Sequence, residues 1–306
     1  MNNKILLMIL VVLMVLFALS RMGGSGKKNK SFSSDIFSID TAAIQSIKIK
    51  TKFDKEPFEV KKTNGAWMVA NSKLNVPSSQ KVVSALFDQV ADIKALRLAA
   101  TKPEKWTDYE ADDASGSEVQ FFNGNEEIGR LVIGRFNYNP QQQSMVSFVR
   151  VPEKGPEVYA VDGYLPLTLQ SGFNGFRNKE LLNINKDQVK SITLKGLNGQ
   201  DQLILVDGQW NSKGTVKDST DVADWIKSVS NLQGSEFHED PASVTANAPL
   251  YELDLLSDEQ VVVKVYKNTI EGKPFVVSSN QNKDSYFLSD STGIYQKLYE
   301  DLKVIF

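Results

Sequence analysis

Residues 43–49 read AIQSIKI and residues 188–194 read QVKSITL, and these two copies of one pattern decide the fold. Apolar and polar residues alternate in both stretches, which is typical of a half-buried β-strand. The matched positions are Ile44 with Val189, Ser46 with Ser191, Ile47 with Ile192 and Ile49 with Leu194. Recurrence of one strand pattern within a chain indicates an internal duplication.

The segments after the two copies repeat in the same order. A second alternating strand comes next, EPFEVKK (56–62) in the first copy and DQLILV (201–206) in the second. Asn64-Gly65 and Asp207-Gly208 then predict tight hairpin turns. A tryptophan ends each turn, Trp67 or Trp210. Either ring could stack on a ligand, but their repeated position favours packing in the core of each copy.

An amphipathic helix is predicted after each tryptophan. In the first copy it follows Pro77-Ser78, and in the second Asp218 and Ser219 are candidate N-caps. Apolar residues at helical spacing define the buried faces, Val82, Val83, Leu86, Phe87, Val90 and Ile93 in one and Val222, Trp225, Ile226, Val229 and Leu232 in the other.

Four further strands follow each helix. They are EVQFF (118–122), RLVIG (130–134), MVSFVRV (145–151) and EVYAV (157–161) in the first copy, and YELDLL (251–256), VVVKVY (261–266), PFVVS (274–278) and SYFLS (285–289) in the second. The predicted class is therefore α+β, with two tandem antiparallel sheets, each covered by one or two helices. We place the two domains at residues 35–182 and 183–306. The second closes on an amphipathic helix from Ile294 to Ile305.

The N-terminus predicts a membrane segment. Residues 5–19 are fifteen consecutive apolar residues, roughly 22 Å of helix against a hydrocarbon core of ~30 Å. We interpret residues 1–22 as a retained transmembrane anchor; the alternative is a cleaved signal peptide, with Ala18 and Ser20 as small cleavage-site residues. Residues 23–34 (GGSGKKNKSFSS) are typical of a flexible basic linker.

The orientation of that segment rests on two signals that disagree. Arg21, Lys27, Lys28 and Lys30 come after the apolar run, which by the positive-inside tendency favours a cytoplasmic bulk. Short N-terminal apolar segments, however, usually direct export of the rest of the chain. We expect a single-pass protein of a bacterial inner membrane with most of the chain in the periplasm.

Composition excludes several classes of function. The 306 residues carry 35 basic and 37 acidic side chains, a formal charge of −2, so no basic footprint for nucleic acid is present. The chain has no cysteine, which excludes thiolate catalysis, disulfides and a lipid-modified cysteine anchor. One histidine leaves little for a Ser-His-Asp constellation. We therefore expect no enzyme, no cofactor and no metal.

Two polar clusters have ordinary explanations. His238, in SEFHEDP, has Glu236, Glu239 and Asp240 nearby, but a solvated turn explains it better than a metal site or a catalytic base. The run of Asp108, Glu110, Asp112 and Asp113 superficially matches a calcium loop. Asp113 and Val119 stand where that loop needs glycine and glutamate, so a charged surface loop is favoured.

A long loop is the candidate partner-binding site. Residues 134–147 (GRFNYNPQQQSMVS) separate two predicted strands, and the second copy has a shorter counterpart. Long loops in compact sheets are often functional, the alternative being an exposed segment without a role. Its candidate binding residues are Phe136, Tyr138, Gln141, Gln142 and Gln143.

The order of strand, GxW turn, helix, strand ending in Ile-Gly, FVRV…VYAV pair and FRNKELL (176–182) resembles the bacterial family catalogued as domain of unknown function 4340. Proteins similar to these are typically encoded beside ABC-transporter components, including those of the gliding-motility type. The resemblance implies an accessory extracytoplasmic subunit with ABC-transporter-type membrane partners and supplies no catalytic residues. The alternative is a periplasmic binding protein with an unknown ligand between its two domains.

Overall fold

The structure, a computed structural model, describes residues 34–140, 143–196 and 199–306. Its largest sheet has ten strands. In spatial order these are β1 (Asp35–Ser38), β6 (Asp92–Ala100), β10 (Val158–Asp162), β9 (Ser144–Arg150), β8 (Glu126–Asn139), β7 (Ser117–Asn123), β2 (Ser46–Lys50), β3 (Phe58–Thr63), β4 (Ala66–Ala70) and β5 (Asn75–Pro77). All of their pairings are antiparallel.

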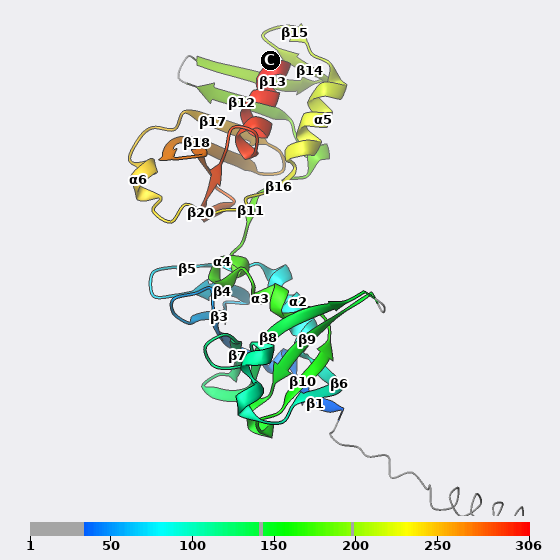
Figure 1. Cartoon of the computed structure of the whole chain (residues 1–306). Helices are drawn as coiled ribbons and strands as arrows, with labels where there is room; N and C mark the ends of the chain where they lie inside the picture. Colours follow the sequence, from blue (N-terminus) through cyan, green and yellow to red (C-terminus); the bar gives the residue numbers. More distant parts are fainter. Residues whose placement is uncertain (1–33, 141–142, 197–198) are drawn as a thin grey trace, which may run out of the picture.

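A second sheet of eight strands lies in the C-terminal part of the chain (Figure 1). Its order is β15 (Thr215–Val216), β14 (Gln209–Ser212), β13 (Gly199–Val206), β12 (Ser191–Gly196), β17 (Tyr251–Leu256), β18 (Gln260–Ile270), β19 (Lys273–Ser279) and β20 (Asn282–Ser289). The same order runs from β5 through β4, β3, β2, β7, β8 and β9 to β10 in the first sheet. The two halves therefore share one topology, and the α+β class is confirmed.

The short third sheet completes the repeat. β11 (Glu180–Asn183) pairs with β16 (Asn231–Gln233), as β1 pairs with β6. In the first half β6 continues along β10, whereas in the second the chain after β16 makes a single bridge to β20, Phe237 opposite Phe287. Gly234 lies between, and a Cβ there would stand 1.9 Å from the Phe287 ring, so only glycine fits.

Helices cover one face of each sheet, and in the second half the short helix α6 (Ala242–Thr245) packs on the other face. The first half has α2 (Gln80–Val90), α3 (Leu165–Leu169) and α4 (Gly172–Phe176). The second has α5 (Ser219–Val229), α6 and a C-terminal helix made of a π-helical stretch (Gln296–Glu300) followed by α7 (Asp301–Ile305). Each half buries its own apolar cluster, one within residues 36–176 and one within residues 181–302.

The predicted turns and tryptophans are confirmed. Asn64-Gly65 and Asp207-Gly208 all have positive φ, as the tight hairpin turn requires. Trp67 lies edge-on to Phe87 of α2, with ring centroids 5.5 Å apart, and Trp210 is buried in the second cluster. Both rings pack in a core, so ligand stacking does not explain them.

Both predicted helices are too long at their C-terminal ends. α2 ends at Val90 and α5 at Val229, while Ile93 lies in β6 and Leu232 in β16. Each of these residues is buried, and each follows the helix by three positions, so its spacing also suits a helix. The Asp218 cap is confirmed, since its carboxylate accepts a hydrogen bond from the backbone N–H of Thr220 at 2.7 Å.

The described residues contain no helix that is both long and apolar enough to cross a membrane. The predicted anchor (1–22) and nearly all of the predicted linker (23–34) lie outside the described residues.

The division into domains stays a prediction, and the hydrogen bonds show where to divide the chain to test it. The Asn178 N–H donates to Pro77 O in the first half, whereas the Gly234 N–H of the second half donates to Lys179 O. Leu181 and Leu182, which precede the predicted division, belong to the second cluster.

We expect residues 34–178 and 179–306, prepared separately, each to unfold in one cooperative transition, because each keeps a complete apolar cluster. Thermal unfolding followed by circular dichroism measures this. Failure of both pieces to fold would mean that the halves depend on shared contacts such as Arg177 against Phe237, whose ring centroid lies 3.5 Å from the guanidinium carbon.

Candidate functional site

Residues 136–139 and 144–147 pair as antiparallel strands of a hairpin, so the predicted loop was wrong for these residues. β8 continues to Asn139 and β9 begins at Ser144, with Phe136 opposite Ser147 and Tyr138 opposite Met145. Phe136 and Tyr138 lie two residues apart, as residues on one face of a strand do, and Pro140 with the glutamines after it hides this spacing in the sequence. Gln143 has φ 49°, and Gln141 and Gln142 lie outside the described residues.

The end of the hairpin projects beyond the neighbouring strand (Figure 1). The ladder between β7 and β8 ends with Ser117 opposite Ile133. Gly134 and Arg135 lie in a bulge, and from Phe136 to Asn139 β8 is paired with β9 alone. At ~3.3 Å per residue the stretch from Gly134 to Asn139 has about 20 Å of open edge.

Two aromatic side chains are exposed on this projection. Phe136 is 36% exposed and Tyr138 is 56% exposed. Because Ile133 pairs with Val149 and Phe136 with Ser147 across a bulge, Phe136 stays on the face that Ile133 uses in the core. Tyr138, two residues on, shares that face. The hairpin thus carries the inner apolar face of the sheet out into solvent.

The base of the hairpin is held by the segment 103–116. The carbonyl oxygen of Tyr109 would lie 2.2 Å from a Cβ at position 134, so only glycine allows this close approach. Arg135 donates from Nε to the Asp108 carbonyl oxygen at 2.9 Å, and its guanidinium lies 5.4 Å from the Phe148 ring centroid.

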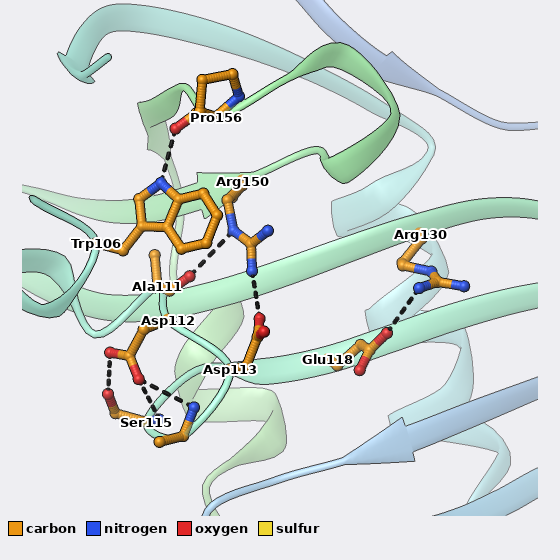
Figure 2. Close-up of polar contacts among 10 residues, drawn as sticks. Trp106, Ala111, Asp112, Asp113, Ser115, Glu118, Arg130, Arg150 and Pro156 are labelled. Atoms are coloured by element: carbon orange, nitrogen blue, oxygen red, sulfur yellow. Dashed lines mark hydrogen bonds and ion pairs between the residues drawn. The ribbon is translucent and has the colours of Figure 1, made fainter. Parts of the chain in front are cut away.

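Arg150, near the end of β9, ties the same segment to the sheet (Figure 2). Its buried guanidinium lies 3.8 Å from the Trp106 ring centroid, a cation–π contact. Nε donates to Ala111 O at 3.1 Å and Nη2 pairs with Asp113 at 2.7 Å. The indole N–H of Trp106 donates to Pro156 O at 2.7 Å.

Each of the four carboxylates in the acidic run 108–113 has a partner within the protein. Asp112 accepts from the backbone N–H groups of Ala114 and Ser115 and from the Ser115 hydroxyl, and that hydroxyl bond holds the pKa of Asp112 below its usual range. The other three carboxylates are in ion pairs, Asp108 with Lys105 (3.1 Å), Glu110 with Lys52 (2.6 Å) and Asp113 with Arg150 (2.7 Å). The described part of the chain has no group of acidic or histidine side chains that could hold a metal ion.

A hollow of 370 Å³ opens beside the unpaired edge of β8. Its walls come from the β2–β3 connection (Lys52, Phe53), the start of β7 (Ser117), the hairpin (Gly134, Phe136) and α3 (Pro166). It therefore begins where the β7–β8 ladder ends.

Comparison with models of known protein families shows to which family this chain belongs. The model of the family described as "Domain of unknown function (DUF4340)" matches residues 67–254. The chain belongs to the DUF4340 family. The match starts at Trp67 and ends in β17, so it contains the whole hairpin. No curated protein and no solved structure matches this DUF4340 chain.

His238 of this DUF4340 protein is buried rather than in the solvated turn that the sequence predicted. Its backbone N–H donates to Tyr286 O at 2.8 Å, which adds the segment to β20, and its Nδ1 accepts from the Asp240 N–H at 3.3 Å. The apolar Phe237 beside it anchors the turn in the core. These contacts give the histidine a structural role.

Sequence reasoning missed Arg150 and Trp106. A signal for Arg150 was present, because a lone cation inside the apolar strand MVSFVRV must find partners when that strand is buried. The partners lie 37 to 44 residues earlier in the chain, at positions that no local pattern connects to β9.

We expect Arg150→Met to lower the free energy of unfolding by about 2–3 kcal/mol, because it removes the cation–π contact and leaves the Ala111 carbonyl without its donor. Arg130→Met is the matched control in the same sheet. Arg130 pairs with Glu118 and Glu127 at a partly exposed site, so its loss should cost less than about 1 kcal/mol. Urea denaturation measures both, and equal effects would reject the bracing role of Arg150.

Proposed function

We propose that this DUF4340 protein is a membrane-anchored, extracytoplasmic interaction subunit of an ABC-transporter-type complex and that it acts without catalysis. The observation that carries the proposal is the braced β8–β9 hairpin, which holds two exposed aromatic side chains on a projecting strand pair. Aromatic residues are enriched at protein interfaces and supply much of their binding energy.

The bracing makes the hairpin a suitable docking element. A free two-stranded hairpin is marginally stable in water, so a partner binding to one would first have to order it. Gly134, Arg135 and Arg150 fix the base of this hairpin to the segment 103–116. The entropy cost of binding is thereby reduced.

The anchor supports a membrane-bound partner. Residues 1–22 contain the apolar run, and residues 23–34 provide a Gly/Ser/Lys-rich tether before β1. Tethering confines the soluble part to the neighbourhood of membrane complexes and raises its effective concentration there. The family resemblance supplies the class of partner, and export of the bulk to the periplasm remains part of the proposal.

We expect the double substitution Phe136→Ser, Tyr138→Ser to reduce recovery of partner subunits at least about tenfold, since two apolar contacts would be lost. The measurement is affinity purification of the full chain from native membranes with quantitative mass spectrometry. Ile270→Ser, at the tip of the equivalent β18–β19 hairpin and 46% exposed, is the matched control and should leave recovery unchanged.

Partner recovery that survives both the double substitution and deletion of residues 136–144 would move the contact to another surface. Loss of function in His238→Ala at unchanged stability would overturn the non-catalytic assignment.

A second candidate function is small-molecule binding between the two halves. A hollow of 420 Å³ is lined by the start of α2 (Ser79, Lys81), the connecting segment (Arg177, Lys179) and Gln233 of β16. Its size suits a small ligand. Burial lowers the pKa of Arg177, partly offset by Glu239, so this cation is desolvated at the junction. Ligands retained by the purified chain and identified by native mass spectrometry would favour this alternative.

A further inference from the structure

The open edge of β8 and the hollow beside it form one feature. β7 ends its pairing at Ser117, and the hollow is bounded on one side by Gly134 and Phe136 of β8 and on the other by Lys52 and Phe53. The space therefore continues the line that β7 occupies farther along the sheet. A strand lying in this space would be the next neighbour of β8 in the sheet.

Backbone groups along this edge point to a strand as the occupant. Each second residue of an antiparallel edge strand presents its N–H and C=O away from the sheet. The described ladders of residues 134–139 run only to β9. A chain segment laid along the edge would satisfy these groups with main-chain hydrogen bonds, as in strand addition at other open sheet edges.

The walls of the hollow define the side chains that fit. Phe53, Phe136 and Pro166 provide an apolar lining, and Phe53 is 55% exposed. At the rim Lys52 pairs with Glu110 at 2.6 Å, and its ammonium has further N–H donors. Arg135 adds a second cation, so the rim carries two positive charges and one negative charge.

We infer that β8 takes up an extended segment of the partner along Gly134–Asn139, with an apolar side chain in the hollow and a carboxylate at a neighbouring position facing Lys52. The charge balance of the rim is the reason for the carboxylate. This inference rests on the proposed function and specifies how the partner is recognised.

Among the described residues, the second half lacks an equivalent of the open edge and hollow, because its own chain covers the corresponding part of β18. β18 also extends beyond its neighbour, since Tyr251 of β17 opposite Val265 is the last pair of their ladder. There the Leu250 N–H donates to Val265 O, and on the inner face Phe275 of β19 stacks on Tyr295 with ring centroids 3.6 Å apart. The chain itself covers the start of that projection, whereas no described segment does the same for Phe136.

The test uses the immobilised full chain and a phage library of random peptides of about twelve residues, long enough to span the edge. We expect enriched peptides with alternating apolar residues and an acidic neighbour. Their binding should slow amide hydrogen exchange within residues 134–139. Phe53→Ser should weaken binding about tenfold to a hundredfold, because the apolar contact is lost.

Val216→Ser is the matched control, since Val216 in β15 of the second half is 55% exposed, as Phe53 is. It should leave peptide binding unchanged. Enrichment without the alternating pattern, protection outside residues 134–139, equal binding to Phe53→Ser, or no enrichment would each overturn strand addition. Partner capture that depends on Phe136 with no edge protection would keep the proposed function and reject this mode. Peptides that bind the edge of β8, with no partner subunit captured from membranes, would support strand addition and reject the proposed function.

Discussion

The pairing of β8 with β9 beyond the end of β7 is the constraint on which the functional account depends. Two strands that leave a sheet lose the neighbours that normally fix them, and a hairpin alone is barely stable in water. Here the loss is compensated at the base. The close approach of Tyr109 to Gly134 and the stack of Arg150 on Trp106 join the segment 103–116 to the outer face of the same strands. The projecting part can then expose Phe136 and Tyr138 while keeping one register.

Duplication supplied the scaffold, and the two copies then diverged in what covers each sheet. Both halves keep the order of the eight matched strands. In the second half α6 covers Tyr266 and Val276 on β18 and β19, and the broken strand around Gly234 replaces the long β6. In the first half the segment 103–116 packs on Phe148, and the edge of β8 stays open. The second half thus covers the start of its hairpin with its own chain, whereas the first half leaves Phe136 and Tyr138 exposed.

The sequence predicted the repeat, the α+β class, the two turns and the buried tryptophans, because these features depend on local patterns. The sequence-based prediction failed where one spacing of apolar residues fits both a helix and the strand that follows it. Ile93 and Leu232 lie at helical spacing, yet each enters the same core from a strand that follows the helix. The hairpin has the composition of a loop, because Pro140 and the glutamines stand between its two strands.

Long-range contacts could not be predicted at all. The partners of Arg150, the pairing of β1 with β6 and the close approach at Gly134 each join segments far apart in the chain. The candidate residues Phe136 and Tyr138 were found from the sequence, but the open edge beside them follows from where β7 ends.

Photo-crosslinking in intact cells tests the central claim most directly, that the first hairpin is the surface that contacts a partner. A photoreactive phenylalanine analogue would replace Phe136 in one variant and Ile270 in another, both on projecting hairpins. The account predicts a discrete adduct with a membrane-complex subunit from position 136 and none from position 270. Adducts from position 270 alone, or none from position 136, would contradict it.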